Sequence, residues 1–327
     1  MIGTSLGLAL LDRGAVVAGI DRRTNPWTDR IPTTLMDLCA AGALNAFDWP
    51  ADIVVHLAAH AKVHATVRNP QLAYENFIAG AAVLELARLR RVPLILGSSR
   101  EVYGNVSRTR VGEKAVFVDK SASPYSATKL AIEALGHSYR RCYALPIVIL
   151  RFSNVYGRYD NDLDRLERVV PLFIKQIAAA SPVVIFGAEK RLDFTFIDDC
   201  VAGIVRTIEA TLGGGLTEHV INIASGKGYS LMDLATLIGE AVGKPPTVVL
   251  ESTRAGEVVH YVARLDIARR ALGYRSKVML PEGIRRALAW QSGHRGAPPA
   301  LVLEAGYCEP ASMPAAALAS GATTIST

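Results

Sequence analysis

Residues 71–97 read QLAYENFIAGAAVLELARLRRVPLILG and contain two patterns in succession. Apolar residues recur at helical spacing from 71 to 91, which predicts a long helix. An apolar run over 92–97 follows at once and predicts a buried strand. The same order returns downstream, with a helix predicted over 125–143 and a strand over 146–152. Apolar strands that alternate with helices predict a parallel sheet covered on both faces.

Similar segments extend this pattern toward both ends of the chain. Strands are predicted over 15–20, 52–57, 183–186 and 220–224, a strand followed by a helix over 194–209, and helices over 170–180 and 230–242. Ser230 is expected to cap the last of these helices, with Asp233 at its third position. We therefore expect an α/β protein with a doubly wound parallel sheet and a smaller α/β domain after it.

The composition narrows the functional classes. The chain has 327 residues and a formal net charge of +6, but its basic residues are scattered singly and in pairs. This distribution argues against nucleic acid as a partner and fits anionic small molecules such as nucleotides. No apolar run approaches the roughly 18 residues of a membrane span, so no membrane partner is expected. Four widely spaced cysteines (Cys39, Cys142, Cys200 and Cys308) predict reduced thiols in a cytoplasmic protein, with neither a disulfide framework nor a metal site.

The N-terminus reads MIGTSLGLALLDRG and looks like the end of a glycine-rich turn that runs into a helix. Gly3 would be the last glycine of a Rossmann-type dinucleotide-binding turn, with a strand and then Asp21 following on schedule. Asp21 would accept the adenosine ribose hydroxyls, which favours NAD because a 2′-phosphate would be repelled. Arg22 and Arg23 weaken that preference and leave NADP open.

The first strand and the first two glycines of such a unit are missing from this sequence. That strand is central in the fold, so its absence would expose neighbouring strand edges and remove half of the pyrophosphate cradle. We therefore expect the true start to lie upstream, with Met1 as an internal methionine.

The candidate catalytic residues are Ser99, Tyr125 and Lys129. Tyr125 and Lys129 are four residues apart and would share one face of a helix. An ammonium beside a phenol is expected to lower the pKa of the phenol toward working pH. Together with the Ser99 hydroxyl, the pair could remove the proton of an alcohol that becomes a ketone while a nicotinamide takes the hydride.

These residues and their neighbours resemble the extended short-chain dehydrogenase/reductase family, in its NAD-dependent epimerase/dehydratase branch. The resemblance runs from Gly3 to about Trp290. The motifs that carry it are 52–59 (DIVVHLAA), Asn69-Pro70, Asn76 with Gly80, Ser98-Ser99 with 102–104 (VYG), Tyr125 with Lys129, 150–157 (LRFSNVYG) and 193–199 (DFTFIDD). In this order the set is highly specific.

The resemblance implies roles for individual residues. Cofactor contacts are expected from Ile2, Gly3, Asp21, Arg22, Asp37, Leu38, Leu57, Ala58, Ala59, Asn76, Tyr125 and Lys129. Contacts with a nucleotide-sugar substrate, with UDP favoured, are expected from Ser99, Asn154 and Arg254, and from Arg191 as a weaker candidate because Leu192 stands where the family has its arginine. Arg158 and Arg165, with Arg168, are candidates to pair a C6 carboxylate.

The segment Ser99-Arg100-Glu101 separates the chemistries within the family. Glucose-type dehydratases resemble Thr-Asp-Glu at this place, and Arg100 cannot act as the acid because a guanidinium keeps its proton. We therefore favour a 4-epimerase of UDP-glucose/galactose or UDP-glucuronate/galacturonate. A UDP-glucuronate decarboxylase with an active Glu101 is the alternative, followed by a 4,6-dehydratase. A non-catalytic regulator that binds NAD(H) or a nucleotide sugar is the alternative from another class, and the presence of all three catalytic residues argues against it.

The same resemblance implies an organisation for the chain. We expect residues 1–155 to form the NAD-binding domain, with 190–212 returning to it. Residues 156–189 and 213–295 would bind the nucleotide sugar, and 296–327 would form a weakly ordered tail. The two long helices resemble the pair that builds a four-helix interface in homodimers of this family.

Overall fold

A four-stranded parallel sheet lies at the centre of the computed structural model, which describes residues 1–46, 50–106, 109–160 and 168–294. Its order is β3 (Val54–His56), β4 (Leu94–Ser99), β5 (Ile147–Phe152) and β9 (Val220–Ile223). All three pairings are parallel. The predicted parallel sheet is therefore confirmed.

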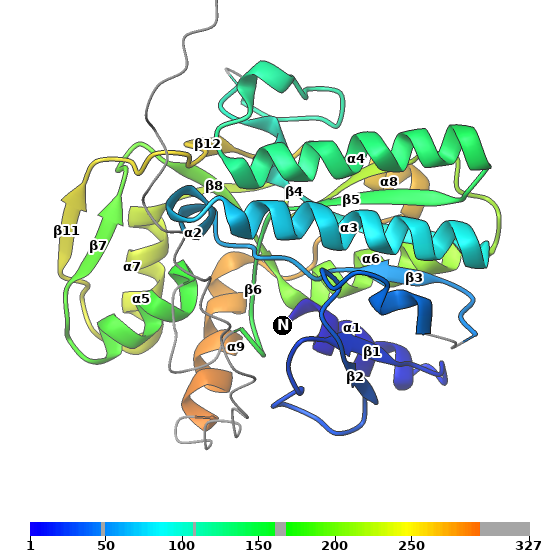
Figure 1. Ribbon diagram of the computed structural model, residues 1–327. Helices are drawn as coiled ribbons and strands as arrows, with labels where there is room; N and C mark the ends of the chain where they lie inside the picture. The colour runs from blue at the N-terminus through cyan, green and yellow to red at the C-terminus, as the bar shows by residue number, and fades with distance from the viewer. Residues whose placement is uncertain (47–49, 107–108, 161–167, 295–327) are drawn as a thin grey trace, which may run out of the picture. The chain divides into compact units, whose positions relative to one another are not determined.

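Helices cover both faces of this sheet (Figure 1). On one face, α3 (Gln71–Arg90) and α4 (Pro124–Tyr143) pack against each other and against alternate strand residues such as Leu96 and Ile149. On the other, α1 (Ile2–Leu11) and α6 (Ile197–Leu212) share a core with the intervening residues Ile95 and Leu150. Burial on both faces explains why these strands are apolar throughout.

A separate two-stranded parallel sheet joins β1 (Gly19–Asp21) to β2 (Thr33–Leu35). Within the described residues, β1 pairs with β2 alone and β3 pairs with β4 alone. The strand expected over 15–20 is thus confined to its last residues, and Val16 lies almost wholly exposed, at 92%. Without a partner on its other side, β1 has no ladder to extend it toward Ala15.

Besides β9 and α6, the described residues from Asn154 onward form two smaller sheets and four further helices. β10 (Gly228–Ser230), β8 (Arg191–Phe196) and β12 (His260–Tyr261) form one sheet, with β6 (Asn154–Tyr156) also paired to β8, and β7 (Val183–Phe186) pairs with β11 (Val248–Glu251). The helices are α5 (Val169–Ala178), α7 (Leu231–Val242), α8 (Asp266–Leu272) and α9 (Leu280–Gly293).

Short elements complete the chain: α2 (Val63–Arg68) and the 3₁₀ turns η1 (Ala43–Ala46), η2 (Arg100–Tyr103) and η3 (Val118–Lys120). The predicted cap of α7 is confirmed, because Ser230 and Asp233 each accept a hydrogen bond from the other's backbone N–H. The expected tail over 296–327 lies outside the described residues. In the part of the chain described above, no helix is both long and apolar enough to cross a bilayer.

Candidate active site

The first turn of α4 presents Tyr125 and Lys129. The helix begins sharply because Ser123 and Ser126 cap it reciprocally: the Ser123 hydroxyl accepts from the Ser126 N–H at 3.2 Å, and the Ser126 hydroxyl accepts from the Ser123 N–H at 3.0 Å. Pro124 occupies the first helical position, where its missing N–H costs nothing. Tyr125 and Lys129 follow on one face and are both buried.

Ser99 reaches the same place from the sheet. It is the last residue of β4, at the carboxyl edge where ligands of parallel sheets bind. Its hydroxyl accepts from the Glu101 N–H at 3.2 Å and makes a side-chain hydrogen bond with Tyr125. The structure thus brings Ser99, Tyr125 and Lys129 together.

The expected pKa of Tyr125 was wrong in direction. Burial raises the pKa of this phenol to about 12, while the hydrogen bond from Ser99 lowers it and the neighbouring Glu101 raises it further. The Lys129 ammonium lies 5.9 Å from the centre of the Tyr125 ring and donates to the Gly97 carbonyl at 2.8 Å. Desolvation of the phenolate therefore outweighs the ammonium that the sequence places nearby.

Lys129 is poised to change its charge. Burial lowers its pKa to about 8, and Glu133, one turn further along α4, opposes that shift. Buried His56 at the end of β3 is held neutral, since burial and then the Lys129 charge lower its pKa to about 3. Neither His56 nor Glu133 was singled out from the sequence, although the i, i+4 spacing from Lys129 to Glu133 was a usable signal.

A buried polar network fixes α4 on the sheet. Arg151 of β5 donates to both Glu133 oxygens, at 2.9 and 2.6 Å, and to the Tyr103 hydroxyl at 3.1 Å. The Tyr103 hydroxyl donates in turn to Asn222 at 2.6 Å, and Ser98 donates to Glu133. Because these groups satisfy one another away from water, they hold the catalytic helix in one register.

The residues after Ser99 form a second buried charge pair. An Arg100 Nη2 group lies 2.8 Å from Glu101 Oε1, and Arg100 Nε donates to Asn154 Oδ1 at 3.2 Å. Arg100 Nη1 and Glu101 Oε2 are buried without a hydrogen-bond partner among the described residues. Burial raises the pKa of Glu101, and Arg100 opposes that shift. Both ends of the Asn154 amide are used, since its Nδ2 donates to the Asp193 carbonyl at 2.9 Å.

The remaining substrate candidates are spread over the second half of the chain. The Arg254 guanidinium lies 3.5 Å from the centre of the Phe186 ring, a cation–π contact that fixes it above β7. Arg191 opens β8 and is exposed. Arg158 forms an ion pair with Asp198, so its charge is already matched. Arg165 lies outside the described residues.

The start of α1 offers uncapped backbone N–H groups of the kind that bind a diphosphate. This helix has no side-chain cap, so its first N–H groups stay available. Burial lowers the pKa of the Met1 amino group to about 6, and the charges of Arg168, Asp160, Asp21 and Arg23 also act on it. A side chain at Gly3 would meet open space. An unpaired helix start, an exposed carboxylate at Asp21 and the Lys129 ammonium suit a dinucleotide.

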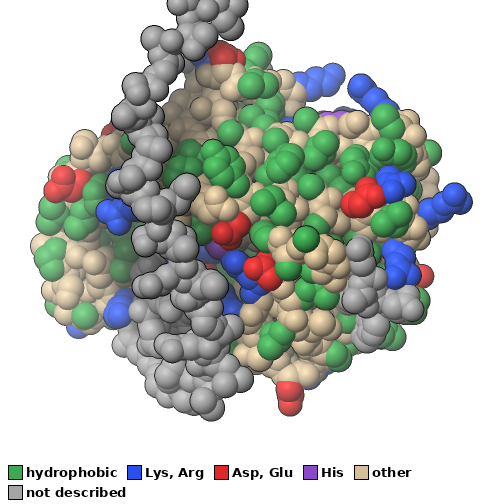
Figure 2. Space-filling view, viewed as in Figure 1, with side chains coloured by type: hydrophobic (Ala, Val, Ile, Leu, Met, Phe, Trp, Pro, Cys, Tyr) green, Lys and Arg blue, Asp and Glu red, His purple; other side chains and the backbone are tan. Residues whose placement is uncertain are grey.

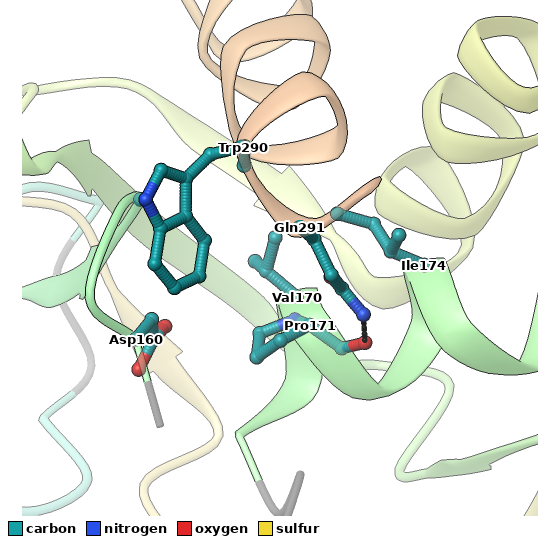
Figure 3. Close-up of a pocket in the computed structure, with 8 residues that line it drawn as sticks. Asp160, Val170, Pro171, Ile174, Trp290 and Gln291 are labelled. Carbon is teal, nitrogen blue, oxygen red and sulfur yellow. Dashed lines mark hydrogen bonds between the residues drawn. The ribbon is translucent and has the colours of Figure 1, made fainter. Parts of the chain in front are cut away.

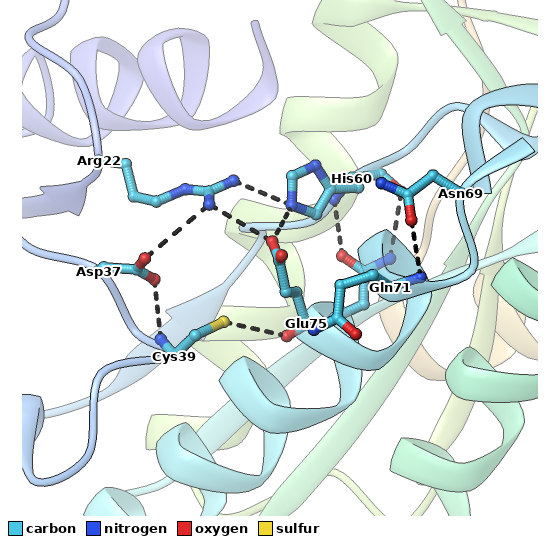
Figure 4. A network of polar contacts seen from close by, with 8 residues as sticks. Arg22, Asp37, Cys39, His60, Asn69, Gln71 and Glu75 are labelled. Carbon is cyan, nitrogen blue, oxygen red and sulfur yellow. Dashed lines mark hydrogen bonds and ion pairs between the residues drawn. The ribbon is translucent and has the colours of Figure 1, made fainter. Parts of the chain in front are cut away.

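The other cofactor candidates lie in the segments after β2 and β3 and on α3. Ala58 and Ala59 are exposed just after β3, and Leu57 and Leu38 are half-buried. Asn76 is buried and clamps His60, with its Oδ1 accepting from the His60 N–H at 2.7 Å and its Nδ2 donating to the His60 carbonyl at 3.1 Å. Figure 4 shows Arg22 and Glu75 in contact with this histidine, and Asp37 facing Arg22.

A small pocket lies elsewhere, between α5 and α9 (Figure 3). Apolar side chains line most of it, with buried Asp160 at one side and Gln291, which donates to the Pro171 carbonyl at 3.3 Å. It includes none of the three candidate catalytic side chains, Ser99, Tyr125 and Lys129. No cluster of three or more His, Cys, Asp or Glu able to hold a metal occurs within the described ranges.

Comparisons with known proteins agree with this geometry. The model of the NAD dependent epimerase/dehydratase family matches residues 1–224. A probable UDP-glucuronate 4-epimerase of Rhizobium meliloti is 28% identical over 325 residues, covering 88% of this chain and 93% of that protein.

Solved structures of UDP-sugar 4-epimerases are also similar to this chain. A UDP-glucose 4-epimerase of Thermus thermophilus in complex with NAD superposes with a TM-score of 0.80 at 28% identity, covering 90% of this chain and 96% of the other. A UDP-glucuronic acid 4-epimerase of Bacillus cereus, in complex with UDP-glucuronic acid and NAD, superposes with a TM-score of 0.76 at 28% identity, covering 89% and 96%. The chain belongs to the NAD-dependent epimerase/dehydratase family.

Proposed function

We propose that this protein is an NAD-dependent 4-epimerase of a UDP-sugar. The observation that carries the proposal is the meeting of the Ser99 hydroxyl, the Tyr125 phenol and the Lys129 ammonium at the carboxyl edge of the sheet. NAD, when bound, supplies the acceptor and later the donor of a hydride. The relatives named above act on UDP-glucose and UDP-glucuronate, which supports a UDP-sugar.

The protein's own residues then handle the proton of the sugar 4-hydroxyl. Tyr125 takes this proton and returns it after the 4-keto sugar has turned its other face. Ser99 donates to or accepts from the same oxygen and so orients it. Lys129 carries the positive charge that favours a phenolate, which requires it to turn from the Gly97 carbonyl toward the ring.

Among UDP-sugars we propose a hexuronate, and Arg100 is the main support. Its Nη1 group is buried without a hydrogen-bond partner in the described structure, in the residue next to Ser99. A C6 carboxylate is the anionic group nearest the reacting C4 of such a sugar and would complete a guanidinium fork. Both arginines have a carboxylate partner: Arg100 pairs with Glu101 through Nη2, and Arg158, the candidate expected from the sequence, pairs with Asp198.

Replacing each of these two arginines by glutamine tests whether the substrate is a hexuronate. In Arg100→Gln, kcat/KM for UDP-glucuronate relative to UDP-glucose should fall by roughly 100-fold, the loss expected when a buried charge-assisted contact disappears. Arg158→Gln should leave the ratio near that of the wild type. A fall in Arg158→Gln alone would reassign the carboxylate to Arg158.

The products distinguish the alternative reactions. The purified protein with NAD and a panel of UDP- and dTDP-sugars should give a product of unchanged mass and altered chromatographic retention. Loss of CO2 would establish the decarboxylase and an active Glu101, and loss of water would establish the dehydratase. Bound NAD with no product from any sugar would favour the regulator. Buried Glu101, paired with Arg100, supports the structural role of this carboxylate over a catalytic one.

We also propose a homodimer in the cytoplasm, built on α3 and α4. Four large apolar side chains are exposed on these helices: Tyr74, Ile78, Leu89 and Tyr143. Figure 2 views this side of the molecule and shows hydrophobic side chains spread across it. Sedimentation velocity should give a dimer mass for the wild type and a monomer mass for Ile78→Glu.

A further inference from the structure

Arg22 lies where we expect the adenosine ribose of a bound dinucleotide, and NAD and NADP differ at the 2′ position of this ribose. It follows Asp21, the last residue of β1. An acidic residue at this strand end binds the ribose 2′-hydroxyl of NAD, whereas an arginine there accommodates the 2′-phosphate of NADP. This chain carries both residue types side by side. Whether it prefers NAD or NADP therefore depends on where the Arg22 side chain points.

The Arg22 guanidinium is engaged by three neighbours (Figure 4). Its Nη2 lies 2.9 Å from His60 Nε2, and its Nη1 lies 3.5 Å from Glu75 Oε2 and 4.0 Å from Asp37 Oδ2. His60 Nε2 is itself 2.7 Å from Glu75 Oε2. Glu75 therefore holds the arginine directly and through the imidazole.

These neighbours are fixed by the fold rather than by chance encounter. Asn76, the residue after Glu75 on α3, clamps the His60 backbone through both ends of its buried amide. The Glu75 carbonyl accepts from Cys39 Sγ at 3.4 Å, and Asp37 accepts from the Cys39 N–H at 2.9 Å. Glu75 is thus tied to the loops after both β2 and β3, and its side chain is three-quarters buried at 25% exposure.

The local charge balance disfavours a phosphate. Two carboxylates, on Asp37 and Glu75, lie within 4.0 Å of the Arg22 guanidinium and more than offset its single charge. A guanidinium is the preferred partner of a phosphate, but only when its N–H fork is available. Here Glu75 and His60 occupy that fork.

We infer that Glu75, by holding Arg22, is the positioning residue that makes this protein select NAD over NADP. The inference concerns the dinucleotide alone and does not depend on which sugar the protein converts.

The test measures binding of the reduced dinucleotides by their fluorescence. In Glu75→Gln, the ratio of Kd for NADPH to Kd for NADH should fall by roughly tenfold, because a carboxylate is lost from the phosphate's surroundings and Arg22 is released. This improvement in NADPH binding should become smaller as salt is added, because Arg22 is half exposed and its charge is screened. Adding Arg22→Gln to Glu75→Gln should remove the gain, since the released arginine is what binds the phosphate.

Glu85→Gln is the matched control, since Glu85 lies on the same helix and pairs with Arg88 instead. It should leave the Kd ratio at the wild-type value. A Kd ratio in Glu75→Gln equal to that of Glu85→Gln would overturn the inference. So would a gain for NADPH that persists in the Glu75→Gln, Arg22→Gln double variant.

Discussion

Glu133 lies one helical turn after Lys129 on α4 and works against the burial that lowers the pKa of Lys129 to about 8. The same carboxylate is held by Arg151 of β5. The buried Arg151 guanidinium and the ammonium of Lys129, a candidate catalytic residue, therefore share one anion. The charge of Lys129 consequently depends on the packing of α4 against the sheet, because that packing sets the position of Glu133.

Lys129 should make the stability of the ligand-free protein depend on pH. An unfolded lysine keeps its proton up to its ordinary pKa of 10.5, whereas the folded Lys129 releases it near pH 8. Between these values the unfolded state binds more protons, so stability rises with pH. Urea unfolding of the wild type should show a gain of about 1 kcal/mol per pH unit from pH 8 to 10, relative to Lys129→Met.

Above pH 10 the sign reverses through Tyr125. The unfolded phenol ionises at its ordinary value of 10.0, while burial keeps the folded one protonated to about 12. A stability profile that is flat from pH 8 to 10, or identical in Lys129→Met, would contradict this account of Lys129.

Replacement of Tyr125 by phenylalanine should abolish most turnover and leave folding intact. The phenol is buried and its ring would be retained, so the change removes the proton acceptor and the hydrogen bond to Ser99. We expect kcat to fall by about 10²–10⁴-fold. Tyr139→Phe, on the same helix but bonded to Glu85, should keep wild-type turnover. An unimpaired Tyr125→Phe enzyme would refute the assignment of Tyr125.

Loss of the Glu133 charge should destabilise the protein strongly. The Glu133→Gln change leaves the Arg151 guanidinium buried at about 5% exposure without its counter-charge. Breaking such a pair from one side costs about 3–5 kcal/mol. Thermal unfolding of Glu133→Gln should show this loss, whereas Glu282→Gln, which breaks exposed pairs with Arg285 and Arg286, should barely shift Tm. Equal shifts in the two variants would exclude a structural role for the buried pair.

Gly104 ends the turn that carries Ser99 and Arg100. It has φ of 58°, and an added Cβ would collide with the Lys120 carbonyl oxygen. Gly104→Ala should therefore lose at least about 2 kcal/mol of folding free energy, through backbone strain and overpacking together. Gly112→Ala is the control, because a Cβ there meets only ordinary contacts with Arg264. If denaturant unfolding gave the same midpoint for both variants, the turn would not depend on Gly104.

The parts of this structure that could be predicted from sequence are those set by local patterns. The α7 cap needs only Ser230 and Asp233, three residues apart, and the long helices need only their apolar spacing. The strands β4 and β5 were recognisable because both of their faces are buried. Tyr125 and Lys129 were recognisable because one helix turn joins them.

The remaining features depend on contacts between distant segments. Arg151 of β5 contacts Glu133 of α4, and Arg254, in the segment after β11, contacts Phe186 at the end of β7. The spacing of these residues in the sequence does not predict either contact. The pKa of Tyr125 was predicted in the wrong direction because it depends on how deeply the ring is buried, which only the packed structure gives.

Within the described residues, β1 and β2 pair only with each other, and this has a consequence for local unfolding. A two-stranded sheet is marginally stable by itself, so this segment should open without the rest of the protein. Its backbone amides should exchange with deuterium much sooner than those of β4 and β5, which have a strand on each side. Because Asp21 and Arg22 border this segment, bound NAD should slow its exchange more than that of any other strand pair. The segment expected to bind adenosine would then become ordered when NAD binds, whereas Ser99, Tyr125 and Lys129 are already held in place without it.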